Sequence, residues 1–179
     1  SLGLVTDFAD LTRGMSITGI RDYTVDRHYA MTRTKKAHSD FKANAADVTF
    51  TNAIGLCFIV TIVVDNNNVA LRYTIPRQKG NSAGCAVIRR EATSFRLPDG
   101  TTTFLCPQTA PMTGWERTKP SYEEEYTADA PMSARSKYGV GYTFPCLFHE
   151  QAADNGGKSD YWVLISETGV DGGYCASRL

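Results

Sequence analysis

The chain has 179 residues, of which 42% are hydrophobic and 21% are charged, a composition typical of a folded protein rather than a disordered one. Its basic and acidic residues number 19 each, so it lacks the positive field that binding to nucleic acid or to an anionic membrane requires. No segment approaches the roughly 20 consecutive apolar residues of a membrane-spanning helix.

Alternating and β-branched segments dominate the chain, and each predicts a strand. Residues 47–52 alternate in polarity, and residues 56–76 hold two apolar segments around a turn at 65–68, where Asp and Asn tolerate the backbone of a tight turn. Pro76 ends the second of these strands, because proline has no N–H to donate to a sheet. Further strands are expected at 85–97, 102–107, 141–150 and 161–168, separated by turns at 98–101, 154–160 and 170–174.

Helical signals are weak throughout. No long amphipathic helix is found, and the best short candidate is a turn at 7–14. No repeat or low-complexity linker marks a domain boundary. The patterns therefore predict an all-β, antiparallel, sandwich-type fold in which residues 1–179 form a single domain.

Several kinds of active site find no support in the motifs. The chain has no phosphate-binding loop, dinucleotide fingerprint or GxSxG elbow, which argues against phosphoryl transfer, hydride transfer and serine hydrolysis. The cysteines are widely spaced and form no CxxC pair, which argues against a zinc knuckle. Cys57 lies in an apolar segment and is expected to be a buried small hydrophobe. The five cysteines are Cys57, Cys85, Cys106, Cys146 and Cys175.

Carboxylates are concentrated at residues 123–125, which are three consecutive glutamates between Tyr122 and Tyr126. They lie in an irregular stretch that runs from Cys106 to Lys137, and long irregular stretches in compact domains are often functional. On the residues alone, a solvated acidic loop and a cation site shared with another domain both remain open. An acid/base pair of a glycosidase is disfavoured, because neighbours in sequence rarely hold two carboxyl groups about 5–10 Å apart across a bond.

The histidines and the remaining aromatic residues carry weaker signals. His28, His38 and His149 are too far apart in sequence for a local pair of metal ligands, and His149 is expected at the surface, at a strand end. One of Tyr161 and Trp162 is expected to face the core, since they are neighbours in an alternating strand.

Five motifs follow one another along the chain: SLGL, VALRYTIP, YEEEYT, FPCLF and YWVLISETGVDGGYCASRL. Taken together, they resemble the N-terminal domain of glycoside hydrolase family 97, which contains α-glucosidases and α-galactosidases of carbohydrate-foraging bacteria. The resemblance implies an antiparallel β-super-sandwich akin to galactose mutarotase, followed by a (β/α)8 catalytic barrel and a small C-terminal β domain. It also implies that further strands precede Ser1.

The resemblance implies a non-catalytic role for this chain. The catalytic carboxylates of the family lie on the barrel, so we expect no catalytic residue here and no activity from these residues alone. The N-terminal domain of the family contributes a glutamate to a Ca²⁺ site at the substrate-binding end of the barrel. The local Tyr-Glu-x-x-Tyr pattern indicates Glu123 as that ligand, with Glu125 as the fallback, and the isolated chain is expected to bind Ca²⁺ weakly or not at all. Arg72 is expected to form a structural ion pair or a carbonyl clamp, and Glu167 is assigned no role.

The expected partners are the catalytic barrel of the same protein and an α-linked oligosaccharide, with no nucleic acid and no membrane span. The expected location is periplasmic or secreted. A stand-alone carbohydrate-binding module is the alternative, with the aromatic residues near 115–126 stacking on sugars. A mutarotase-like enzyme is a third hypothesis, and it needs a carboxylate beside His28, His38 or His149 in a concave sheet.

Overall fold

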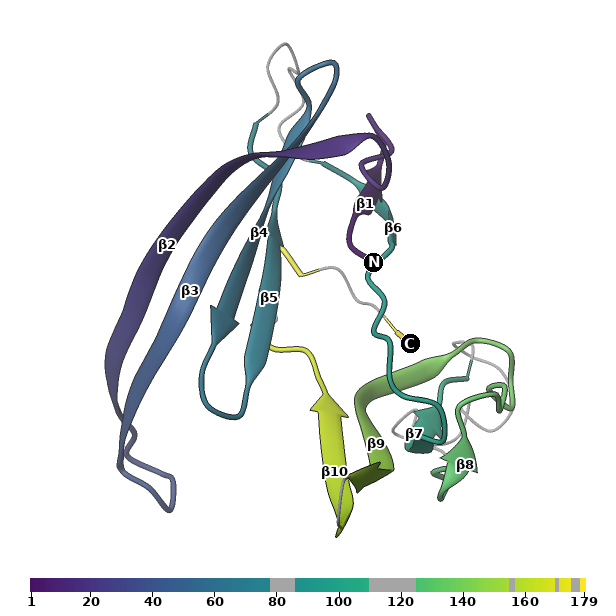
Figure 1. The fold of residues 1–179 in the computed structure, drawn as a ribbon. Coiled ribbons are helices and arrows are strands. Elements are labelled where there is room, and N and C mark those ends of the chain that lie inside the picture. Colours follow the sequence, from purple (N-terminus) through teal and green to yellow (C-terminus); the bar gives the residue numbers. More distant parts are fainter. Residues whose placement is uncertain (78–85, 110–124, 155–156, 170, 175–177) are drawn as a thin grey trace. The chain divides into compact units, whose positions relative to one another are not determined.

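A computed structural model describes residues 1–77, 86–109, 125–154, 157–169, 171–174 and 178–179. Within these ranges every regular element is a strand, and all the strand pairs are antiparallel (Figure 1). The predicted all-β, antiparallel fold is therefore confirmed. The described part of the chain has no helix long and apolar enough to cross a membrane. Two compact units, Ser1–Ser94 and Phe95–Leu179, are described in turn.

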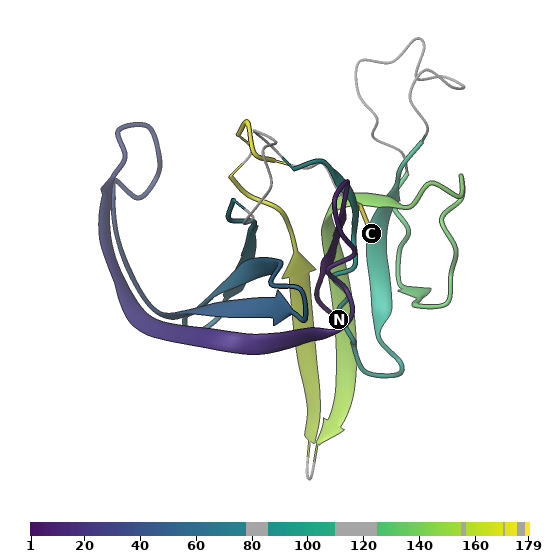
Figure 2. The same cartoon turned by 90° about the horizontal axis from the view of Figure 1, so that it is seen from above.

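A four-stranded sheet forms most of the first unit. Its strands pair in chain order, since short turns join each strand to the next: β2 (Met15–Ala30), β3 (His38–Asn52), β4 (Cys57–Val64) and β5 (Val69–Thr74). β4 pairs with β3 only from Asn44 to Thr51, so the rest of β2 and β3 continues as a two-stranded ribbon. This ribbon is long and curved (Figures 1 and 2).

The turn between β4 and β5 lies where the sequence predicts it. The Asp65 carboxylate accepts hydrogen bonds from the backbone N–H groups of Asn67, at 3.0 Å, and Asn68, at 2.8 Å. These bonds stabilise the charged carboxylate and lower the pKa of Asp65, with the Asn67 bond the largest cause. Both strands around the turn are confirmed, and β5 ends at Thr74, just before Pro76.

The core of the first unit lies on one face of this sheet. Phe58 and Val60 on β4 are buried with Leu11, whose N–H donates to the carbonyl of Leu4 on β1 (Leu4–Thr6). The Phe58 ring stacks on Phe50 of β3, with centroids 5.1 Å apart. β1 pairs with β6 (Ile88–Glu91), which covers only part of the strand expected at 85–97.

Cys57 is half-buried rather than buried, so that prediction is wrong. Neighbouring residues of a strand face opposite sides of the sheet. Because Phe58 faces the core, Cys57 faces away from it.

The second unit contains another four-stranded sheet, in the order β10-β9-β7-β8. Its core is formed by Leu105, Tyr142, Cys146 and Phe148. The strands predicted at 102–107, 141–150 and 161–168 are present, the last two with shifted ends. The strands are β7 (Thr102–Pro107), β8 (Ala130–Pro131), β9 (Tyr142–Asp154) and β10 (Gly157–Ile165).

Candidate functional site

The chain that follows the three glutamates is anchored on β7. The N–H of Thr127 donates to the carbonyl of Leu105 at 2.8 Å, and the hydroxyl of Thr127 accepts from the N–H of Leu105 at 2.9 Å. Two residues further on, the Asp129 carboxylate accepts from the Thr102 hydroxyl at 2.6 Å, and β8 then pairs with β7. The described chain from Thr127 to β8 is therefore fixed on β7.

The predicted ligand itself, Glu123, lies outside the described residues, as do Glu124, Tyr122 and Trp115. Glu125, the fallback, is exposed and is two residues from the Thr127 anchor. Tyr126 is half-exposed.

A cation site formed by this chain alone would need several oxygen, nitrogen or sulfur ligands close together. The described residues include no group of three or more His, Cys, Asp or Glu side chains that could together hold a metal ion. A site shared with another domain needs only one carboxylate from this segment, and carboxylate oxygens are the ligands that Ca²⁺ prefers. Of the three glutamates the structure describes Glu125, which is exposed and two residues from the Thr127 anchor.

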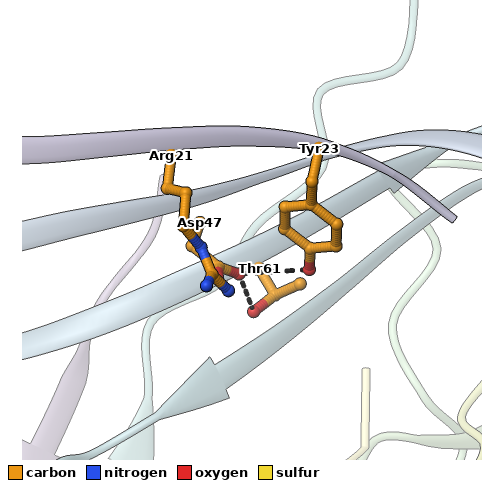
Figure 3. A network of polar contacts seen from close by, with 4 residues as sticks. All are labelled: Arg21, Tyr23, Asp47 and Thr61. Atoms are coloured by element: carbon orange, nitrogen blue, oxygen red, sulfur yellow. Dashed lines mark hydrogen bonds and ion pairs between the residues drawn. The ribbon is translucent and has the colours of Figure 1, made fainter.

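Figure 3 shows a polar network on the first sheet, and the strand register places it on the face opposite the core. The Asp47 carboxylate accepts from Arg21 at 2.6 Å, from the Thr61 hydroxyl at 2.8 Å and from the Tyr23 hydroxyl at 3.3 Å. The Thr61 bond is the largest cause of a lowered pKa at Asp47, and the Arg21 bond is the next. The Arg21 guanidinium also lies 5.1 Å from the centre of the Tyr23 ring. The network ties three neighbouring strands together.

Arg72 extends the same row. The register places Arg21 opposite Asp47, Asp47 opposite Thr61, and Thr61 opposite Arg72. Arg72 is exposed, and among the described residues no ion pair or carbonyl contact of its guanidinium is found. The structural ion pair or carbonyl clamp expected for Arg72 is therefore not seen in this part of the chain.

Two of the three histidines do lie beside carboxylates. On the ribbon of β2 and β3, His28 lies 2.6 Å from Asp40 and 3.6 Å from Asp26, and Lys42 lies 3.1 Å from Asp26. All four side chains are exposed to solvent, so this cluster is a charged surface rather than an enclosed catalytic pair.

His149 lies on β9, on the face of the second sheet opposite the core, and is paired with Asp160 of β10. Its ring stacks on Trp162, with centroids 4.1 Å apart and planes 10° from parallel. Of Tyr161 and Trp162, Tyr161 lies on the core face as predicted, but neither is buried there: the two residues are 51% and 52% exposed. Tyr161 shares a face with Phe148 but extends past the core cluster, which ends before it.

A pocket of about 590 Å³ lies in the described part of the second unit, and its lining differs from the polar clusters above. It lies beside the core residues Leu105 and Phe148 and is lined by the segment 131–136, which includes Arg135. No histidine and no carboxylate side chain lines it. It therefore lacks the His–carboxylate pair of the mutarotase-like hypothesis.

Two further groups have perturbed acidity. Burial, together with the nearby Cys106 and Glu167, raises the pKa of the Cys146 thiol to about 11. The Tyr174 hydroxyl donates to the Glu167 carboxylate, and this hydrogen bond raises the pKa of Tyr174. Both residues are held in their protonated forms, which suits structural roles better than nucleophilic ones.

The sequence interpretation missed both polar clusters. The Asp47 network needs β2, which was not predicted because its charged and apolar residues do not alternate cleanly. The His149–Trp162 pair had an available signal: the predicted strands at 141–150 and 161–168 flank a Gly-rich turn, and pairing them as a hairpin brings these two residues opposite each other.

Comparisons with known proteins match the whole chain. A family model described as glycosyl-hydrolase 97 N-terminal matches residues 1–179. A probable retaining alpha-galactosidase of Streptomyces bingchenggensis (strain BCW-1) is 25% identical over 178 residues, which are 99% of this chain and 24% of that protein. This chain thus spans about a quarter of that relative's length.

Solved structures agree. A crystal structure of a beta-arabinopyranosidase is 48% identical, with a TM-score of 0.85 over 99% of this chain and 27% of that one. A glycoside hydrolase family 97 enzyme from Pseudoalteromonas sp. strain K8, in complex with panose, is 20% identical and shares the fold, with a TM-score of 0.68 over 84% of this chain and 21% of that one. The fold is thus that of the N-terminal β-sandwich of these enzymes. The chain belongs to glycoside hydrolase family 97, of which it is an N-terminal domain.

Proposed function

We propose that this domain is a non-catalytic part of an exo-acting glycosidase, where it shapes the active-site entrance and lends one carboxylate to a Ca²⁺ site. The observation that carries the proposal is the match to the family's N-terminal domain over residues 1–179, in a chain that spans about a quarter of its relatives. The catalytic acid and base would then belong to a (β/α)8 barrel in the same protein.

The activities in the names of two relatives suggest the substrate of the parent enzyme. One is a beta-arabinopyranosidase and the other a probable retaining alpha-galactosidase. A β-L-arabinopyranoside has the ring configuration of an α-D-galactoside and lacks only its hydroxymethyl group. One active site that selects the axial 4-hydroxyl group accepts both, so we propose that the parent enzyme cleaves terminal residues of this configuration rather than α-glucosides.

Glu123 remains our proposed cation ligand, with Glu125 as the fallback. The support is the anchor at Thr127, which holds the backbone on β7 four residues after Glu123 and two residues after Glu125. A bound Ca²⁺ would supply positive charge that orients the sugar. The residues of this chain would only hold that ion in place. An enzyme that hydrolyses oligosaccharides outside the cytoplasm would be exported, so we propose a periplasmic or secreted location.

The test uses the full-length enzyme and three p-nitrophenyl substrates: the α-galactoside, the β-L-arabinopyranoside and the α-glucoside. We expect activity on the first two and loss of activity on adding chelator. Glu123→Gln should lose most of its activity and regain part of it with excess Ca²⁺, whereas the matched variant Glu125→Gln should behave as wild type. Wild-type activity in Glu123→Gln would contradict the assignment, and a preference for the α-glucoside would contradict the proposed substrate.

A further inference from the structure

We propose that Trp162 and Asp160, with His149 and Gln151 beside them, form a saccharide-binding platform on the second sheet, on the face opposite its core. The inference rests on the proposed function for its ligand class. Its residues are far in sequence from the acidic segment, and they bind sugar by stacking rather than through a metal.

Strand register builds the platform. Trp162 lies opposite His149, and Asp160 lies opposite Gln151, so an aromatic row and a polar row lie next to each other. The two rows are about 6–7 Å apart along the strand, which is close to the width of a pyranose ring. A single sugar can therefore contact both rows.

The aromatic row is rigid. The His149 ring lies flat against one face of the Trp162 indole, and the imidazole also pairs with Asp160. The Phe104 ring of β7 packs against the indole in a tilted orientation, with the ring centroids 5.5 Å apart. The His149 side chain is only 13% exposed, whereas Trp162 is 52% exposed. Packing thus fixes the indole before any ligand arrives, and binding would cost little side-chain entropy.

Trp162 keeps exposed surface for a ligand: among the described residues its ring contacts are with His149 and Phe104, and it is 52% exposed. His149 covers the face toward β9, and β10 has no second neighbour among the described strands of its sheet. An exposed, flat aromatic surface of this kind matches the C–H face of a pyranose ring.

The polar row supplies the hydrogen bonds that a sugar needs. One Asp160 oxygen is engaged by His149, and no partner of the other is found in the described part of the chain. That oxygen can accept from a sugar hydroxyl group, and the exposed Gln151 amide can both donate and accept. A purely apolar partner would leave these groups unpaired, so the combination favours a saccharide over an apolar protein surface.

Retardation of the full-length enzyme in native gels that contain arabinogalactan tests the platform. We expect Trp162→Ala to weaken the apparent affinity roughly tenfold, the equivalent of about 1.4 kcal/mol, and Trp162→Phe to keep most of it. Trp162→Ala should also lower kcat/KM on arabinogalactan more than on a p-nitrophenyl glycoside. Tyr161→Ala is the matched control, since this aromatic residue is adjacent and equally exposed but points to the other face, and it should change neither quantity.

Two surface variants cover the case in which Trp162→Ala does not fold. Asp160→Asn and Gln151→Ala change exposed side chains, the first keeping an acceptor for His149, and should each weaken retardation without lowering Tm. Wild-type retardation in all three variants would overturn the proposal. So would a loss of Tm in both Trp162→Ala and Trp162→Phe with retardation unchanged, because this would show an apolar packing face. Retardation without any hydrolysis would reject the proposed enzyme and leave the platform standing.

Discussion

Thr127 and Leu105 are joined by a reciprocal pair of hydrogen bonds, in which each residue's N–H finds an acceptor on the other. The N–H of Leu105 donates to the side-chain hydroxyl of Thr127 rather than to a backbone carbonyl, and this bond completes the pair. It fixes the chain immediately after the three glutamates on the central part of β7. A carboxylate that serves a neighbouring domain needs such a support, since a freely moving side chain loses entropy whenever it binds.

Thr127→Val should weaken the fold, because valine keeps the shape of threonine but leaves the N–H of Leu105 without its acceptor. The expected loss in the free energy of unfolding is about 1–2 kcal/mol, measured by urea denaturation. Thr127→Ser is the control, since it retains the hydroxyl group, and it should lose less than half as much. Equal losses in the two variants would show that the methyl group, rather than the hydrogen bond, is what matters.

Asp47→Asn should destabilise the first unit in a pH-dependent manner. The pKa of Asp47 is lowered in the folded protein, mainly by Thr61 and then by Arg21, so its stabilising effect is fully present above the ordinary pKa of 3.8. That effect is lost as the pH falls through the folded pKa, where the carboxylate becomes protonated. The urea midpoints of wild type and Asp47→Asn should therefore differ at pH 7 and converge toward pH 2. A difference that is constant with pH would contradict a role for the charge.

The fold class and the strands around the turn at 65–68 could be predicted from the sequence because both depend on local patterns. Asp65 forms its turn with Asn67 and Asn68, all within a few residues. β2 could not be predicted in the same way. Most of its side chains are exposed, so burial imposes no alternation on them, and the strand is defined by its pairing with β3 instead.

The candidate sites also differ in whether a local sequence pattern could reveal them. The proposed ligand Glu123 came from a family resemblance and lies outside the described residues. The partners of Asp47 and His149 come from neighbouring strands, and a pattern read along one strand does not contain them. Only the register of a sheet brings Asp160 and Trp162 to His149.

Cys146 should resist alkylation in the native protein. Its pKa of about 11 means that roughly one thiol in a thousand is ionised at pH 8, and the thiolate is the reactive form. Cys57 is half-buried, so iodoacetamide should modify it much faster than Cys146, and mass spectrometry of the peptides would show this. After denaturation in urea the two rates should become similar. Equal rates in the native protein would show that the core around Cys146 opens readily.

Phe58→Ala should be the most damaging of these changes. The side chain is buried, stacks on Phe50 of β3 and packs at 5.8 Å against the ring of Tyr73 of β5, so its removal leaves a cavity between these two rings. The expected loss is about 3–5 kcal/mol, since Phe→Ala changes in cores cost this much. Ile54→Ala is the control: Ile54 is 80% exposed, and its removal should change the free energy of unfolding by less than about 0.5 kcal/mol. Similar losses in the two variants would mean that Phe58 does not anchor the core of the first unit.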